Sequence, residues 1–512
     1  MNDQRRDLEK LDEAGLRALA LQLFARIDGL ERMLFARKSE KTRYVDPTAL
    51  LPFPEFAQLR DQVQAAEQKA ETVEVPAHTR TKSQRRSEFP EHLPRHTTEC
   101  TLDEIQRKCP ECGDQRGPIG QVETKELERL ELCYVHVIQR RKYACARCSG
   151  HVVTAPGPDR VLERCIMGPN FLAQVIFDHF ANHMPYARLE RKYAAEGLDL
   201  SRSVLNSSTM RCADLLAPVC KAHKEEVLQS LTDGVLQSDD TEAIQRHGND
   251  KGRDKVHVWA WRDQDGGVFF DITPSRNQAT VEQVLAGRSG RLQCDGHDCF
   301  NKPGAAIVRI GCWAHARRKF KDALLGGDEL ARPAMEWTRQ IFAIERQARE
   351  TGIRDPDTLR ALRQEKTRPI LDDLKRWIDL KLLEQAGLPK SPLMDAVGYA
   401  SNQWTTLTRF VDDGHIRDIT NNGVERSLRS VVIGRRNWLW FGSEDGARRS
   451  AVLMSLVQSC KELRINPLLY LRDVLRAVAT TPASEVRRLT PRGWKLAHGS
   501  ATPAPAAFLP VS

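Results

Sequence analysis

Three acidic positions in the second half of the chain have the types and placement needed to bind divalent metal ions. Asp239, with Asp240 beside it, and Asp295 stand near the ends of strand-like segments, VLQSDDTEAIQ and RLQCDGHDCF, and Glu425 lies in a helix-like segment, TNNGVERSLRSVVIGRR. Mg²⁺ prefers oxygen ligands, and a two-metal centre needs carboxylates that converge from separate elements to hold the ions about 4 Å apart. Such a centre serves in-line phosphoryl transfer.

Each acid also has an ordinary structural interpretation. An isolated aspartate at a strand end usually forms a turn or caps a helix. Glu425 is four residues before Arg429, which is the spacing of a surface ion pair worth only a few tenths of a kcal/mol. Yet Glu425 also stands near Arg426, Arg435 and Arg436, and a metal ligand that faces a phosphodiester belongs among positive charges. We therefore favour the metal-binding interpretation.

Four of the thirteen cysteines form two closely spaced pairs. Cys109 with Cys112 in KCPECGD, and Cys145 with Cys148 in KYACARCSG, lie on expected tight turns. Two such pairs commonly form a tetrahedral zinc site, and the metal would supply much of the folding free energy of so small a segment. The gap between the pairs is longer than usual, but a strand hairpin would span it. The alternative is two unrelated turns that each contain cysteines.

Another pair of metal-binding residue types occurs in GCWAHARRKF, where Cys312 precedes His315 by three positions on an expected helix. Both side chains could contribute to a metal site. A buried cysteine, with a histidine that faces DNA or a core carbonyl, is the more common outcome, and we favour it. Four aromatic residues could stack on an unpaired base, although we expect most of them to belong to a core: Trp404, Trp438, Trp440 and Phe441.

Composition indicates a multidomain protein with a polyanionic partner. The 512 residues exceed the size of one core, and no run approaches the roughly 20 apolar residues of a membrane span. The N-terminus lacks an apolar signal-peptide core, so we expect a cytoplasmic protein without disulfides or membrane association. The net charge is only +9, but basic clusters recur in RTKSQRR, IQRRKY, HARRKFK and GRRN. These clusters suit nucleic acid, although any single one could be a solvated face.

Four segments precede the acidic residues. In residues 1–40 a four-and-three apolar spacing predicts an amphipathic or coiled-coil helix, which could pair protomers or pack on its own chain. We interpret residues 41–100 as a linker and residues 101–160 as the zinc-binding domain. Residues 161–230 are helical, either a helix-turn-helix or a plain connector, and we slightly favour the connector.

The acidic residues themselves lie in a segment with a mixed α/β order. The segment reads as a strand, a hairpin with its turn at Asp265 and Gly266, a helix, a strand and a helix. This order predicts a mixed sheet with ligands at its strand ends. A helical insertion must fill the long interval between Asp295 and Glu425. The predicted segments are a catalytic domain at 231–445 with its insertion at about 325–415, a C-terminal helical segment at 446–495 and a Pro/Ala-rich tail at 496–512.

Several of these runs closely resemble the insertion-sequence-66 family of bacterial DDE transposases. The matching runs are LQSDDT, ITPSRNQATVEQVLAGRSGRLQCDG, GCWAHARRKF and ITNNGVERSLRSVVIGRRNWLWFGS, together with KCPECGD, MPYARLERKYAAEGLDLSRS, INPLLYLRDVL and LTPRGWK. The resemblance covers about residues 100 to 495. It implies a multidomain α+β protein with a ribonuclease-H-like catalytic core behind a zinc-binding segment, and an activity of DNA strand cleavage and transfer.

The resemblance also implies a set of site residues. Asp239, Asp295 and Glu425 would be the catalytic triad that binds two Mg²⁺ ions, with Asp240 as the alternative first ligand. A structural Zn²⁺ would bind the four paired cysteines. DNA phosphates would be contacted by Lys319, Arg426, Arg429, Arg435 and Arg436.

Three positions depart from the family pattern. Thr420 stands where an aspartate usually precedes the Asn-Asn pair, His297 stands where a tyrosine usually follows Asp-Gly, and Glu242 replaces a usual proline. None of these changes removes a metal ligand. The lost negative charge near Glu425 would weaken metal affinity, whereas the Thr420 hydroxyl could still cap the helix.

The resulting expectation is a transposase at the bacterial nucleoid that binds element ends and target DNA. It would form a homo-oligomer through its N-terminal helix, with accessory proteins of the same element as candidate partners. Two alternatives remain open: a nuclease of the same fold that cuts without joining, and a catalytically decayed zinc-containing DNA-binding protein.

Overall fold

The computed structural model describes most of the chain after residue 94. The described residues are Phe89, 95–129, 133–145, 152–246, 252–384, 391–438 and 441–499. The predicted N-terminal helix and nearly all of the predicted linker lie outside them. The chain divides into two compact units, residues 88–321 with 330–512 and residues 1–87 with 322–329, and the first contains the elements below except for the end of α8 and the first residue of η4. Among the helices described, none combines the length and hydrophobicity needed to span a membrane.

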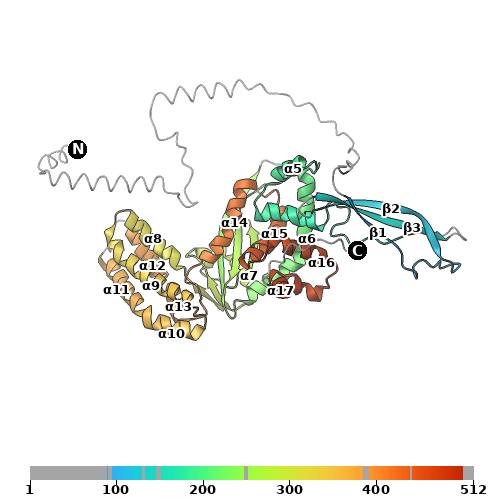
Figure 1. The fold of residues 1–512 in the computed structure, drawn as a ribbon. Helices are drawn as coiled ribbons and strands as arrows, with labels where there is room; N and C mark the ends of the chain where they lie inside the picture. Colours follow the sequence, from blue (N-terminus) through green and yellow to red (C-terminus); the bar gives the residue numbers. More distant parts are fainter. Residues whose placement is uncertain are drawn as a thin grey trace, which may run out of the picture. The chain divides into compact units, whose positions relative to one another are not determined.

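The first unit begins with a small sheet of β1 (Arg95–Cys100), β2 (Arg116–Arg129), β3 (Cys133–Cys145) and β4 (Val153–Thr154). β2 and β3 pair antiparallel as a long hairpin, which Figure 1 shows as an extended ribbon, and β1 and β4 pair with β3. Arg116 faces Cys145 in the register. The turn before β2 therefore lies beside the end of β3.

Four helical elements follow the small sheet: α4 (Pro169–Ile176), the π-helical turn η2 (Phe177–Ala181), α5 (Tyr186–Ala195) and α6 (Arg202–Gln229). The buried carboxylate of Glu128 on β2 accepts a hydrogen bond from the Phe171 N–H at 3.1 Å, at the start of α4. Ser201 caps α6 by accepting from the Val204 N–H. A DNA-binding role for these helices stays a prediction.

The second sheet has five strands: β5 (Val235–Arg246), β6 (Arg253–Asp263), β7 (Val268–Thr273), β8 (Gly290–Gln293) and β9 (Ile307–Ile310). Their order is β7-β6-β5-β8-β9, in which the β5–β6 and β6–β7 pairs are antiparallel and the β5–β8 and β8–β9 pairs are parallel. The predicted mixed sheet is confirmed. So is the hairpin between β6 and β7, in which Gly266 adopts φ +92°, a conformation that favours glycine.

Helices cover both faces of this sheet. Side chains alternate along a strand, so neighbouring residues of β6 enter different cores. Val258 and Ala260 belong to a core shared with α6, α14 (Asn422–Trp438) and α15 (Glu444–Glu462). Trp259 and Trp261 belong to a core shared with α7 (Gln278–Leu285) and the turn η3 (Asp298–Phe300). We call these the α14 face and the α7 face.

A bundle of helices intervenes between β9 and α14 (Figure 1). It contains α8 (Trp313–Leu325), η4 (Glu329–Ala331), α9 (Arg332–Glu350), α10 (Pro356–Lys366), α11 (Arg368–Glu384), α12 (Pro392–Asn402) and α13 (Trp404–Asp412). Arg363 and Glu345 form a buried bidentate ion pair inside it, with N–O distances of 2.8 and 2.7 Å. The chain ends its described part with α16 (Pro467–Ala477), η5 (Ala483–Leu489) and α17 (Pro491–His498).

Candidate active site

The parallel pairing of β5 and β8 places Asp239 beside Asp295. Gln237 is opposite Gln293 in the register, and its Nε2 donates a hydrogen bond to Gln293 Oε1 at 2.8 Å. Each aspartate follows its glutamine by two residues, which returns the side chain to the same face of a strand. That is the α14 face, because Ala243, four residues after Asp239, belongs to the core shared with α14.

A hydrogen bond links the start of α14 to the same glutamine. Gln237 Nε2 also donates to the carbonyl of Thr420 at 2.9 Å. Gly423 lies so close that an added Cβ would stand 2.4 Å from Gln237 Oε1, so the helix can approach the sheet only with a glycine here. Glu425 follows two residues later and is thereby brought to the aspartates.

The charges of the other two acids both act on Asp239. Burial raises the pKa of Asp239 to about 8 from its ordinary value of 3.8, and the negative charge of Asp295 adds to this. The N–H of Asp240 opposes the rise in pKa, while Glu425 contributes a further unfavourable charge. Asp295 and Glu425 thus both lie near enough to affect the pKa of Asp239, while the role of the three acids in catalysis stays a prediction.

Arg276, which the sequence analysis did not identify, lies among these carboxylates. Its Nε is 2.6 Å from Asp240 Oδ1, and its Nη2 is 3.1 Å from Asp295 Oδ2 and 3.9 Å from Asp239 Oδ1. Arg276 belongs to the turn between β7 and α7. In the sequence, only its place after an expected strand, in ITPSRNQ, could have indicated Arg276 as a site residue. That indication is weak.

The neighbouring Asp240 has different surroundings. It points to the α7 face, where its Oδ2 accepts a hydrogen bond from His257 Nδ1 at 2.8 Å while its Oδ1 contacts Arg276. The side chain of Asp240 is 4% exposed, against 16% for Asp239. An arginine and a histidine thus already contact Asp240, whereas Asp239 lies on the α14 face.

Glu425 meets a histidine rather than an arginine. Its Oε1 is 3.8 Å from His315 Nε2 on α8, and no ion pair joins it to Arg429 in the described part of the chain. The ligand atoms of Cys312, His315 and Glu425 all lie within 4.8 Å of one another. Cys312 is buried as expected, and the expectation that His315 faces DNA or a core carbonyl stays a prediction.

The carboxylates fit a divalent cation. Mutual repulsion among Asp239, Asp295 and Glu425 is relieved by added positive charge, which Arg276 supplies only in part. Glu425 Oε1 is buried and accepts no hydrogen bond from any described residue, so it retains a free ligand position. Carboxylate oxygens are also the donor type that Mg²⁺ prefers.

The predicted zinc ligands are partly brought together. Ligand atoms of Cys109, Cys112 and Cys145 lie within 4.8 Å of one another, and Cys148 lies outside the described residues. The Sγ atoms of Cys112 and Cys145 are 3.2 Å apart. The Asp114 N–H lowers the pKa of Cys112, but the hydrogen bond with Cys145 and burial outweigh it and raise the pKa to about 12. Clustered thiols of this kind fit a soft ion such as zinc.

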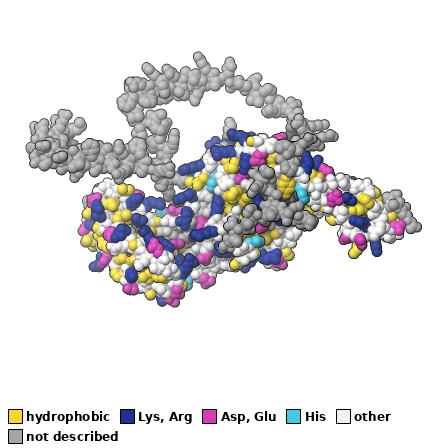
Figure 2. All heavy atoms as spheres, in the orientation of Figure 1, with side chains coloured by type: hydrophobic (Ala, Val, Ile, Leu, Met, Phe, Trp, Pro, Cys, Tyr) yellow, Lys and Arg dark blue, Asp and Glu magenta, His cyan; other side chains and the backbone are white. Residues whose placement is uncertain are grey.

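The predicted phosphate-binding residues differ in their surroundings. Figure 2 shows Lys and Arg side chains over the region of α14. Arg426 and Arg429 are exposed, whereas Arg435 donates to Thr241 Oγ1 at 3.1 Å and to the Glu242 carbonyl. The Lys319 Nζ lies 5.1 Å from the centre of the Tyr399 ring. Lys319 and Arg436 are exposed as well, and contact of any of these residues with DNA stays a prediction.

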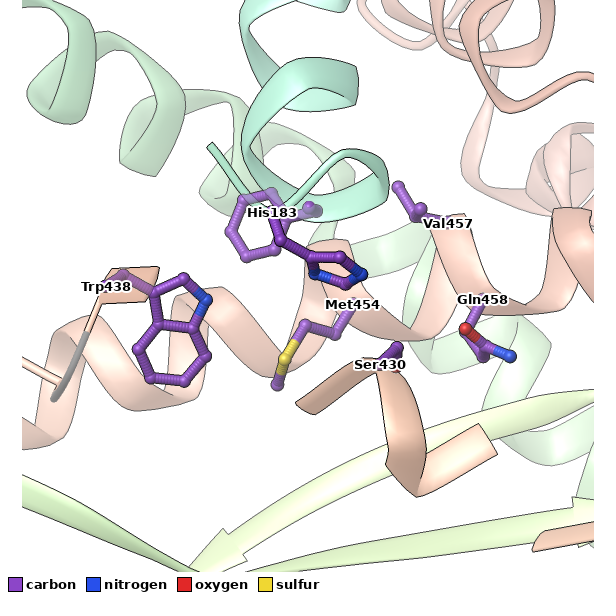
Figure 3. A pocket seen from close by; sticks show the side chains of 7 residues that line it. His183, Ser430, Trp438, Met454, Val457 and Gln458 are labelled. Atoms are coloured by element: carbon purple, nitrogen blue, oxygen red, sulfur yellow. The ribbon is translucent and has the colours of Figure 1, made fainter. Parts of the chain in front are cut away.

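The aromatic residues pack mainly against protein, in keeping with the preferred interpretation. Trp438 packs on buried Phe441 and lines a cavity with His183 and Met454 (Figure 3). The cavity holds about 10 Å³, room for about one water and far too little for a base. Trp404 packs edge-on against Trp313. Trp440 lies outside the described residues.

Comparison with known families gives matches along most of the chain. The family model described as "Transposase IS66 family" matches residues 164–449, which include all three acids. The model described as "IS66 C-terminal element" matches residues 455–492. The model described as "Transposase C of IS166 homeodomain" matches residues 22–98, almost all of which lie outside the described residues.

Curated relatives match over nearly the same length. The "Uncharacterized protein y4hP" of Sinorhizobium fredii (strain NBRC 101917 / NGR234) is 31% identical over 94% of this chain and 90% of its own. The "Uncharacterized protein y4jD" of the same organism is 28% identical over 94% of this chain and 96% of its own. The similarity is thus to whole proteins rather than to one shared domain.

Proposed function

The chain belongs to the IS66 family of transposases, and from this we propose that it cleaves DNA at the ends of an insertion sequence and joins the freed 3′ ends to target DNA. One observation carries the proposal. Asp239, Asp295 and Glu425, which come from β5, the end of β8 and α14, share one electrostatic site. Carboxylates that converge in this way are what two-metal phosphoryl transfer requires.

We assign the five-stranded sheet to a ribonuclease-H-like core. The order β7-β6-β5-β8-β9, with three antiparallel strands followed by two parallel ones and helices on both faces, supports this assignment. The helices α9 to α13 would then be the insertion between the second and third acids. Asp239 on β5, Asp295 just after the end of β8 and Glu425 on α14 are positions that such a core would use for its three acids.

Asp239 rather than Asp240 is our proposed first ligand. Asp239 shares the α14 face with Glu425, whereas Asp240 lies on the opposite face and is held by His257 and Arg276. Bound Mg²⁺ ions would supply the positive charge that activates the attacking oxygen and stabilises the leaving one. Asp240 would orient Arg276, since charge-assisted contacts fix the guanidinium.

The other residues of the chain would bind and orient DNA. Arg426 and Arg429 project from the same helix as Glu425, so a phosphate beside the carboxylates is within reach of positive charge. Arg276 can turn from Asp295 to a non-bridging phosphate oxygen once metal ions neutralise the acids. The cysteine cluster would hold a structural Zn²⁺ and stabilise the segment that we propose binds element ends.

The parts outside the described residues contribute to the proposal only through the family. Pairing of protomers through the N-terminal helix, action at the nucleoid and help from accessory proteins of the same element stay predictions. The match to residues 22–98 supports an additional family segment before the small sheet.

Incubation of the full-length protein with labelled element ends and Mg²⁺ tests the proposed function. We expect nicked ends and joined products from the wild type, and neither from Glu425→Gln. Glu444→Gln, at the exposed start of α15, is the matched control and should retain both products. Nicks without joined products would identify a nuclease. DNA binding without any Mg²⁺-dependent nicks would identify a decayed DNA-binding protein.

A further inference from the structure

We propose that Cys312, His315 and Glu425 form a binding site for a transition-metal ion of the Zn²⁺ or Co²⁺ type. The site would have a thiolate, an imidazole and a carboxylate as ligands, unlike the oxygen-only triad of the proposed transposase. The site shares Glu425 with that triad. This shared residue is the only respect in which the proposal rests on the proposed function.

The geometry of the three side chains suits one small ion. Their ligand atoms lie within 4.8 Å of one another, and His315 Nε2 is 3.8 Å from Glu425 Oε1. Zinc bonds of about 2.0 to 2.3 Å in a tetrahedral site separate neighbouring ligand atoms by roughly 3.3 to 3.8 Å. Small side-chain adjustments would therefore close the site around an ion.

The site lies where the N-terminal ends of α8 and α14 meet. Cys312 immediately precedes α8, Asn421 immediately precedes α14, and the Trp313 N–H donates to the Ile419 carbonyl at 3.0 Å. The Asn421 N–H donates to Cys312 Sγ at 3.3 Å. Outer-shell hydrogen bonds of this kind orient metal ligands.

Two unsatisfied polar groups at this junction point to a missing ligand. Glu425 Oε1 is buried and accepts no hydrogen bond from the described residues. Asn421 is fully buried, and neither Oδ1 nor Nδ2 of its side chain has a hydrogen-bond partner within the described part of the chain. Buried polar groups are normally satisfied, and an ion bound by the three side chains would satisfy the Glu425 oxygen.

The ligand types decide which ion binds. A thiolate and an imidazole favour Zn²⁺ or Co²⁺ over Mg²⁺, which prefers oxygen ligands. Three protein ligands also leave a fourth tetrahedral position open, as in catalytic rather than structural zinc sites. The ion would hold the Glu425 side chain between α8 and the aspartates, and free Zn²⁺ would compete with Mg²⁺ for that carboxylate.

The test measures metal content in the full-length protein without DNA. After saturation with Co²⁺ and removal of the excess, elemental analysis counts bound ions and the thiolate-to-cobalt charge-transfer absorption reports sulfur ligation. Cys312→Ser keeps a side-chain oxygen that can cap α8, and His315→Gln provides a second variant if the first does not fold. The controls are Cys460→Ala, a buried cysteine on α15, and His415→Ala, an exposed histidine.

We expect both cluster variants to bind one equivalent of Co²⁺ fewer than the wild type, whatever the cysteine cluster at residues 109–148 holds. Part of the charge-transfer absorption should disappear with Cys312→Ser, while both controls match the wild type. Full metal content in either folded cluster variant overturns the proposal. The metal measurement uses no DNA, so it does not depend on whether the protein performs strand transfer. The strand-transfer assay in turn does not depend on how many Co²⁺ ions the protein binds.

Discussion

Arg276 donates from Nη2 to Asp295 Oδ2 at 3.1 Å, so a guanidinium lies where we propose that Mg²⁺ binds. The same side chain contacts Asp240 at 2.6 Å and is only slightly exposed. A positive charge this close stabilises the gathered carboxylates in the absence of metal and opposes the arrival of a divalent ion.

Arg276→Gln should therefore bind Mg²⁺ more tightly, by about 10-fold, because one unit of competing charge is removed. The metal-free variant should be less stable by about 3 kcal/mol, since buried carboxylates lose their partner. A Mg²⁺ titration monitored by thermal unfolding measures both effects. Arg288→Gln breaks a more exposed pair with Glu225 and is the control. Weaker Mg²⁺ binding by Arg276→Gln would show that Arg276 supports the metal rather than opposes it.

The raised pKa of Asp239 predicts how stability of the metal-free protein varies with pH. The folded pKa is about 8 and the ordinary value is 3.8, so the folded state binds an extra proton between these two values. The stability that this proton contributes is fully present below about pH 4 and is lost as the pH rises to about 8. In Asp239→Asn the free energy of unfolding should fall less between about pH 4 and pH 8. Denaturant unfolding in the presence of a chelator measures this.

Added Mg²⁺ should also restore stability of the wild type near pH 8, because it replaces the proton as the neutralising charge. The same addition should have little effect on Asp239→Asn. An equal pH dependence in the wild type and the variant would mean that Asp239 is not the group that titrates.

Separate substitutions should distinguish the two adjacent aspartates. Asp239→Asn should lower Mg²⁺-dependent cleavage by more than about 100-fold while the fold stays stable, since a proposed ligand is removed. Asp240→Asn should cost about 1 to 3 kcal/mol of stability, because Arg276 loses a buried anionic partner and His257 loses its carboxylate acceptor. It should retain measurable cleavage. The opposite pattern would make Asp240 the ligand.

Removal of metal from the cysteine cluster should unfold the small sheet before the large one. Cys109 and Cys145 are buried, and the end of the small sheet near these thiols has only a small core, while Val135 and Val137 at its other end belong to the large core. Cys112→Ser should lose Zn²⁺ and increase protease cleavage within residues 95–154, with limited cleavage of residues 253–310. Simultaneous cleavage of both regions would show that the small sheet supports the catalytic one.

The sequence predicted the strands, the hairpin and the acids because each has a local signal. Alternation marks β6, the Asp265–Gly266 pair marks a turn, and acids at strand ends mark a site. Which acid faces α14 depends on the β5–β8 register, which links residues far apart in sequence. The sequence therefore leaves the choice between Asp239 and Asp240 open, and our proposal of Asp239 rests on the sheet.

Two other features of the site have no local signal at all. Arg276 reaches the acids from the turn after β7, and His315 meets Glu425 only because α8 and α14 begin side by side. A bulky insertion separates these two helices in the sequence, so no spacing rule connects them. The spacing of Glu425 and Arg429, in contrast, does follow a local rule and suggested a surface ion pair. The structure does not contain that pair among the described residues.

Gly423 offers a test of whether the position of α14 controls the site. A Cβ at this residue would stand 2.4 Å from Gln237 Oε1 and 2.7 Å from Arg262 Nη1. Gln237 cannot easily move aside, because it is buried, donates to Gln293 and Thr420, and accepts from Arg262 at 3.1 Å. Gly423→Ala should therefore push the helix, and with it Glu425, away from the sheet.

We expect this variant to lose about 1 to 3 kcal/mol of stability and most of its Mg²⁺-dependent cleavage, since overpacking shifts backbone and a small misplacement of a catalytic group is costly. Gly398→Ala on α12 is the matched control. An added Cβ there would meet nothing within 4 Å, so the change should raise stability by about 1 kcal/mol and leave cleavage unchanged. Thermal unfolding and cleavage of labelled ends measure both variants. Normal cleavage by a destabilised Gly423→Ala would mean that Glu425 need not be held by α14 at this distance from the sheet, and the three-acid site would lose its geometric basis.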